Sequence, residues 1–156
     1  MKKAKQLFAR LVLLTLIGTA AGLSVSSPAY ALNCWTPAIL AGQPLPSASY
    51  NCSYPTTQTV FAQRQHIFIV KDVTGTVWYN YQTSVGGPWN GAWISLGGVA
   101  RSSVGVVHGS TGGQPWMSIS VVGTDGFRYC KAYNSSRAPS AWWPSQSTWA
   151  LGNICA

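Results

Sequence analysis

Short apolar runs separated by turn residues dominate the chain after residue 58. The first runs cover residues 66–70, 76–82 and 92–96, and the segments 72–75 and 86–88 between them are rich in Gly, Pro and Asp. Runs of this length with such boundaries are typical of β-strands joined by tight turns. This part of the chain is therefore predicted to be an antiparallel meander.

A second group of short apolar runs, also separated by turn residues, follows the first. It covers residues 104–108, 116–122, 127–133 and 141–143, with a turn at 123–126. Aligning Gly75 with Gly126, an offset of 51 residues, also places Pro88 on Pro139. A period near 50 residues with four short strands per unit is typical of a β-propeller blade. We expect an all-β fold of two blade-like, four-stranded antiparallel meanders, at residues 58–98 and 99–150.

The first 57 residues have a different character. Residues 1–31 combine a basic start, an apolar stretch and an Ala-Tyr-Ala end, which is typical of a secretory signal peptide cleaved after Ala31. Four prolines in residues 32–57 leave room only for very short elements, so we expect a loop-like cap there. No second apolar run is long enough for a membrane span. We therefore expect a secreted protein.

All four cysteines follow the predicted leader, at positions 34, 52, 130 and 155. An even number in an exported chain favours two disulfides, and three connectivities are possible. We favour Cys34 with Cys52 and Cys130 with Cys155, because each pair closes a local loop and would hold a terminal segment. A metal site is disfavoured, since the sequence has no C-x-x-C spacing. No metal and no cofactor are expected.

Charge and composition narrow the function classes. After residue 31 the chain keeps six Lys and Arg against two Asp, so its formal net charge falls from +8 to +4. These six cations are scattered, whereas nucleic-acid binding usually needs a basic cluster along one face. No Glu and only two His and two Asp remain for acid–base chemistry, so we expect no catalytic residues.

Two motifs carry a resemblance to a known family. Residues 89–98 read WNGAWISLGG and are similar to the W-x-x-W-x-x-L-G-G type signature of the bacterial fucose-lectin and tectonin-like propeller repeats. The GTDG turn at 123–126, followed by an aromatic strand, resembles the hairpin that such repeats carry. The second unit departs from the pattern, because no Leu-Gly-Gly follows Trp142 and Trp143. The resemblance covers residues 58–150.

The resemblance implies blade-type sheets and sugar binding, with ligand pockets between neighbouring blades. The 125 residues after the leader hold about two and a half such units, whereas closed propellers usually have four to eight blades. Two explanations stay open. Several chains could assemble one ring as a homo-oligomer, or the same meanders could form a different compact β structure.

Tryptophans are the first candidates for sugar contact, because an indole can stack on the apolar face of a pyranose. Trp89, Trp142 and Trp143 lie beside Gly or Pro, and core packing and ligand contact remain equally open for them. Trp93 is also a candidate, although core packing is favoured. We expect Trp78 and Trp116, each inside an alternating strand, to lie in the core.

Polar residues near these rings could bind sugar hydroxyls, and the candidates are Gln82, Asn90 and Arg128. The two histidines each adjoin a hydrophobic run, which favours structural roles. Asp72 and Asp125 lie at hairpin turns, where a short carboxylate commonly bonds the turn backbone.

We conclude from the sequence that the product is a secreted carbohydrate-binding, lectin-like module that recognises glycans or cell-surface polysaccharide without covalent chemistry. The alternative is a secreted protein-interaction factor without a sugar ligand, such as a toxin component, an inhibitor or a surface-structural protein. Self-assembly and displacement by a free monosaccharide would favour the lectin.

Overall fold

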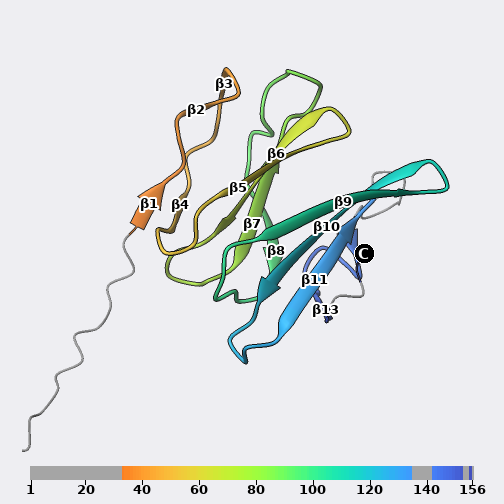
Figure 1. Ribbon diagram of the computed structural model, residues 1–156. Coiled ribbons are helices and arrows are strands. Elements are labelled where there is room, and N and C mark those ends of the chain that lie inside the picture. Colours follow the sequence, from red (N-terminus) through yellow and green to blue (C-terminus); the bar gives the residue numbers. More distant parts are fainter. Residues whose placement is uncertain (1–32, 135–141, 153–154, 156) are drawn as a thin grey trace, which may run out of the picture.

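A computed structural model describes residues 33–134, 142–152 and 155. Every strand pair in this part of the chain is antiparallel, and no helix occurs in it. Figure 1 shows three layers: a narrow N-terminal hairpin, a first sheet and a second sheet. The prediction of an all-β, antiparallel fold is confirmed. The expected signal peptide lies outside the described residues.

The N-terminal hairpin contains only strands of two or three residues, as the prolines predicted. It is built from β1 (Asn33–Trp35), β2 (Ile39–Leu40), β3 (Gln43–Pro44) and β4 (Ser49–Asn51). β1 pairs with β4 and β2 with β3, so the four strands form one long hairpin rather than a loop.

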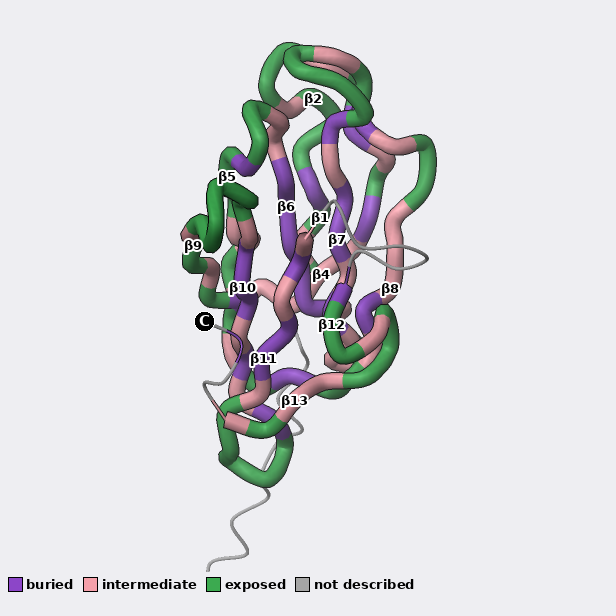
Figure 2. Tube along the Cα trace, turned by 90° about the vertical axis from the view of Figure 1, so that its right-hand side faces the viewer, coloured by how far each residue is buried: buried purple, intermediate pink, exposed green. Residues whose placement is uncertain are grey.

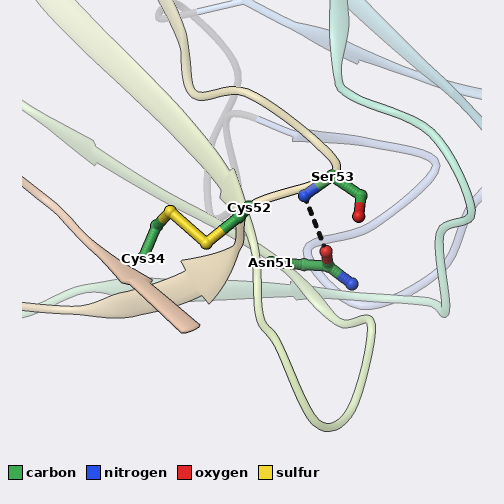
Figure 3. Close-up of a disulfide and its surroundings, with 4 residues drawn as sticks. All are labelled: Cys34, Asn51, Cys52 and Ser53. Carbon is green, nitrogen blue, oxygen red and sulfur yellow. Dashed lines mark hydrogen bonds between the residues drawn. A yellow bond between two sulfur atoms is a disulfide. The ribbon is translucent and has the colours of Figure 1, made fainter. Parts of the chain in front are cut away.

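A disulfide closes the base of this hairpin. Cys34 on β1 is bonded to Cys52, which directly follows β4 (Figure 3). Beside it, the Ser53 backbone N–H donates a hydrogen bond of 2.9 Å to Oδ1 of Asn51. A crosslink of this separation, 18 residues, stabilises the fold by about 3 kcal/mol by restricting the unfolded chain.

The first sheet is a four-stranded meander in chain order. It contains β5 (Thr57–Phe61), β6 (Arg64–Val70), β7 (Val77–Tyr81) and β8 (Ile94–Gly97). β6 has five consecutive buried residues, 66–70. Figure 2 shows most of β6 in the colour of buried residues. Such a continuous run is typical of a strand that is buried on both faces: one face packs on the hairpin and the other on the second sheet.

The second sheet repeats this meander with β9 (Gly105–Thr111), β10 (Gln114–Val122) and β11 (Arg128–Tyr133). Two short strands, β12 (Trp142–Trp143) and β13 (Ala150–Leu151), share the fourth position, because both pair with β11. Residues 144–149 interrupt that fourth strand. The Cys130–Cys155 disulfide holds the end of the chain to β11, so both favoured disulfide pairings are confirmed.

The main core lies between the two sheets, where apolar side chains from both meanders meet. It comprises Phe61, Phe68, Val70, Val77, Tyr79, Leu96, Ala100, Val104, Met117, Ile119, Val121, Tyr133 and Trp142. A smaller cluster of Leu45, Ile67 and Trp89 lies between the hairpin and the first sheet. Trp78 and Trp116 are only half-buried. Their strand neighbours Val77 and Met117 point into the main core, so these two rings lie on the opposite faces, and the prediction that they are core residues is wrong.

The two sheets correspond at the predicted offset of 51 residues. Gly75 and Gly126 both lie in the turn that joins the second and third strands of their sheets, with φ of 66° and 83°. In both turns an aspartate accepts a backbone hydrogen bond, from the N–H of Val73 to Asp72 and from the N–H of Phe127 to Asp125. Among the described residues, neither sheet closes on itself.

Candidate functional site

A cleft opens at one end of the molecule, where the loops of both sheets meet. Its volume is about 400 Å³. Three segments far apart in the sequence form it: the turn after β8, the turn between β10 and β11, and the C-terminal loop between β12 and β13. It is lined by Gly98, Val99, Val121, Gly123, Thr124, Asp125, Tyr129, Ser147 and Trp149.

Tyr129 and Asp125 form a hydrogen-bonded pair at this cleft. The Tyr129 hydroxyl donates to Oδ2 of Asp125 at 2.6 Å. Its ring lies over Gly123, where a Cβ would come within 2.8 Å of Cε2 of the tyrosine. The absence of a side chain at Gly123 is therefore what lets the ring lie at this position.

The charge of this pair is fixed near neutral pH. The hydrogen bond from Tyr129, followed by the one from the Phe127 backbone N–H at 3.1 Å, lowers the pKa of Asp125. The same carboxylate raises the pKa of Tyr129. The cleft therefore presents a carboxylate, whose two oxygens accept hydrogen bonds, beside a neutral phenol.

Trp149 forms the opposite wall, and its orientation is also fixed. Its indole N–H donates to the Leu96 carbonyl at 2.9 Å. The ring lies against Gly98, where a Cβ would be 2.8 Å from Nε1. A hydrogen-bonded indole packed against a glycine has little rotational freedom, so the wall is preorganised.

Lys131 holds the loop that carries Trp149. Its side chain is fully buried, and its ammonium donates to the carbonyls of Ser145 at 2.7 Å, Gln146 at 3.1 Å and Thr148. The ammonium also lies 5.1 Å from the centre of the Trp149 ring. Burial lowers the pKa of Lys131 to about 8. Three carbonyls satisfy the three ammonium hydrogens, so this contact positions residues 145–149.

Most of the tryptophans that were candidates for sugar contact have structural contacts, which is the core-packing alternative left open for them. Trp89 is 5% exposed and donates through Nε1 to the Leu40 carbonyl at 2.9 Å. Trp93 donates to the Pro46 carbonyl at 2.8 Å. Both bonds tie the first sheet to the hairpin. Trp142 is 4% exposed and packs among the rings of the main core.

The predicted polar residues also lie outside the cleft. Gln82 is buried, and its Oε1 accepts a hydrogen bond of 3.1 Å from the Gln65 backbone N–H. Asn90 donates to the Ala92 carbonyl at 2.6 Å within its own loop. Trp143 and Arg128 are exposed, but neither lines the 400 Å³ cleft. The structure does bring some of the sequence candidates together, since Gln82 pairs with Trp89 in a β-bridge and Trp93 packs on the cluster that contains Trp89. None of them lines the cleft.

Sequence reasoning missed Tyr129 and Trp149 as site residues and treated Asp125 only as a turn residue. The signal available was the GTDG turn followed by an aromatic residue. That pattern identifies the hairpin that carries Asp125 and Tyr129, but Trp149 comes from a loop that follows this turn by more than twenty residues.

Neither histidine is among the residues that line the cleft. The two histidines lie elsewhere: His66 is buried between the sheets, and His108 is hydrogen-bonded to the Thr59 hydroxyl at 2.9 Å. In the part of the chain that the structure describes, no group of three or more His, Cys, Asp or Glu could hold a metal ion. No helix there is long and apolar enough to cross a membrane.

Comparisons with known proteins do not assign the chain to a family. No protein-family model matches the chain, and a search of curated proteins also gives no match.

Proposed function

We propose that this chain is a secreted carbohydrate-binding, lectin-like protein whose sugar site is the cleft between the two sheets. The observation that carries the proposal is the combination in one cleft of the Asp125 carboxylate, the Tyr129 phenol and the Trp149 indole. The two disulfides are compatible with an extracellular protein.

These three groups match the surface of a neutral sugar. A carboxylate accepts hydrogen bonds from two adjacent hydroxyl groups, and an aromatic wall contacts the apolar C–H face of the ring. The cleft has no cationic side chain in its lining. Because the Asp125 charge would repel another carboxylate, the site favours a neutral sugar over a uronic or sialic acid.

The two sheets act, in this proposal, as successive propeller-type blades, with the sugar site between them. Their corresponding turns and the 51-residue offset support this interpretation. Two such units leave a ring open, so several copies of the chain complete it. Repeating the site around such an oligomer raises the avidity of individually weak sites.

Two measurements on the oxidised chain starting at residue 32 test the proposal. Light scattering with size exclusion gives the oligomeric state, and tryptophan fluorescence titrated with fucose and other neutral monosaccharides reports sugar that binds near a tryptophan such as Trp149. We expect a discrete oligomer whose fluorescence responds to at least one sugar. A monomer that responds to no sugar would contradict the proposal and favour the protein-interaction factor.

Matched aspartate variants locate the site. Asp125→Asn removes the charge from the cleft, and we expect it to abolish the sugar response. Asp72→Asn makes the same change in the corresponding turn of the first sheet, outside the cleft, and should leave the response intact. Equal effects of the two substitutions would rule out the cleft as the site.

A further inference from the structure

The face of the second sheet that points away from the first sheet carries a separate set of aromatic and polar groups. Along β10, Met117, Ile119 and Val121 point into the main core. Side chains alternate across a strand, so Trp116, Ser118 and Ser120 lie on the outer face, where Trp116 and Ser120 are half-buried and Ser118 is buried between them.

Trp116 forms a flat platform on this face. It lies directly across from Gly109 on β9, and a Cβ at that glycine would come within 2.1 Å of Cζ2 of the indole. The ring therefore rests on the backbone of β9. Its Nε1 donates to the Thr111 hydroxyl at 3.1 Å. An aromatic ring that is already held in place loses little conformational entropy when a ligand stacks on it.

A polar hollow lies further along the same strand. It has a volume of about 240 Å³ and is lined by Ser102, Ser103, Gly105, Ser120, Val121, Val122 and Arg128. Ser120 is four residues from Trp116, which corresponds to ~14 Å along an antiparallel strand. The hollow contributes hydroxyl groups and one guanidinium, whereas the platform contributes an apolar surface.

Neighbouring strands define the borders of this surface. Val107 on β9 is 55% exposed, so that side is open. The Cys130–Cys155 disulfide lies on the β11 side, because Cys130 is directly across from Ser120. The open part is therefore a strip along β9 and β10 that ends at the first residue of β11, Arg128. We call it the β10 strip and define it by Gly109, Trp116, Ser120 and Arg128.

We propose that the β10 strip is a second carbohydrate site, distinct from the cleft, that binds an extended neutral polysaccharide chain. A flat indole at one end contacts the apolar face of one sugar unit, and the hydroxyls and guanidinium at the other end bind hydroxyl groups of another unit. The distance between them exceeds a single sugar ring, so the ligand is a polymer. The strip carries one cation and no carboxylate, so ionic attraction has a small role.

Pelleting with insoluble polymers tests this site. The oxidised chain is mixed with cellulose, chitin, insoluble β-glucan or mannan, and the bound fraction gives an apparent Kd. We expect binding to at least one polymer, weakened about tenfold or more by Trp116→Ala, as for a central aromatic contact. Arg128→Gln should weaken it less, with little change on adding salt.

A second exposed tryptophan provides the control. Trp35 on the hairpin is 65% exposed and lies outside the strip, so Trp35→Ala should bind as the unchanged chain does. Thr111→Val removes only the hydrogen bond that holds the indole, and it should weaken binding even if Trp116→Ala destabilises the sheet. Thermal unfolding of each variant identifies loss of fold.

The outcomes separate this proposal from the one for the cleft. Asp125→Asn should abolish the monosaccharide response and leave pelleting unchanged. The β10 strip is overturned if no polymer binds, if folded Trp116→Ala binds as well as Trp35→Ala, or if binding is confined to acidic polysaccharides and disappears with salt.

Discussion

Acid should destabilise this protein through one buried histidine. His66 on β6 is 1% exposed, and neither ring nitrogen has a hydrogen-bond partner among the described residues. It is surrounded by the rings of Phe61, Tyr81 and Tyr133 at centroid distances of 6.0, 5.8 and 6.1 Å. Burial, then the charges of Arg64 and His108, lowers the pKa of His66 from 6.5 to about 4.

The size of the effect follows from this difference. Because the folded chain binds the proton less tightly than the unfolded chain, its stability is complete above pH 6.5 and falls as the pH drops to about 4. A difference of 2.5 between these two pKa values corresponds to a loss of about 3 kcal/mol. That is a large fraction of the stability of a typical domain, about 5–15 kcal/mol.

Urea unfolding followed by tryptophan fluorescence measures this loss between pH 7.5 and pH 4. The variant His66→Leu cannot take up the proton, so its free energy of unfolding should stay nearly constant over the range. His108→Gln changes the other histidine of the chain, which is exposed, and should still lose most of the stability, because burial, not the His108 charge, is the largest cause of the lowered pKa of His66. If His66→Leu loses as much stability as the unchanged chain, the buried histidine is not the cause.

Three further substitutions test other contacts. Lys131→Met leaves three loop carbonyls without their donor. We expect urea unfolding to show a loss of about 3 kcal/mol and the sugar response to disappear. A stable variant that still binds sugar would contradict the positioning role of Lys131. Gly123→Ala places a Cβ within 2.8 Å of the Tyr129 ring. It should therefore abolish the fluorescence response to sugar and lower the free energy of unfolding by about 1–3 kcal/mol. An unchanged response would show that sugar binding does not depend on the position of this ring. Trp93→Phe removes the hydrogen bond to Pro46, at about 1 kcal/mol, and hydrogen exchange should increase in residues 33–51 but not in the second sheet.

Local sequence pattern was sufficient to predict strands at the positions of β6 to β12 and the turns between β6 and β7 and between β10 and β11, but not the two-residue strand β13. Strand runs and Gly-rich turns are short-range signals, and each depends on a few neighbouring residues. The disulfide pairs were also within reach, because both crosslinks join segments close in sequence. The first strand of the first sheet, β5, was missed, since its sequence TQTVF is too polar to look like a buried strand.

The packing partners of the aromatic residues could not be predicted from the sequence. Trp89 and Trp93 bind carbonyls 49 and 47 residues away in the hairpin, and a one-dimensional pattern does not identify such partners. Trp78 and Trp116 alternate with core residues, and which phase of a strand is buried depends on which face another layer covers.

What the sequence by itself determined is the class of fold: short antiparallel strands in two similar meanders, which depend on the preferences of neighbouring residues, and two disulfides between cysteines 18 and 25 residues apart. Only the tertiary structure decided where a ligand could bind. The cleft is lined by Gly98, Asp125 and Trp149. These residues lie close together because the two sheets stack and because Lys131 donates hydrogen bonds to the loop that carries Trp149. Such a site depends on how layers pack, and the energy that sets the packing comes from contacts between residues distant in the chain.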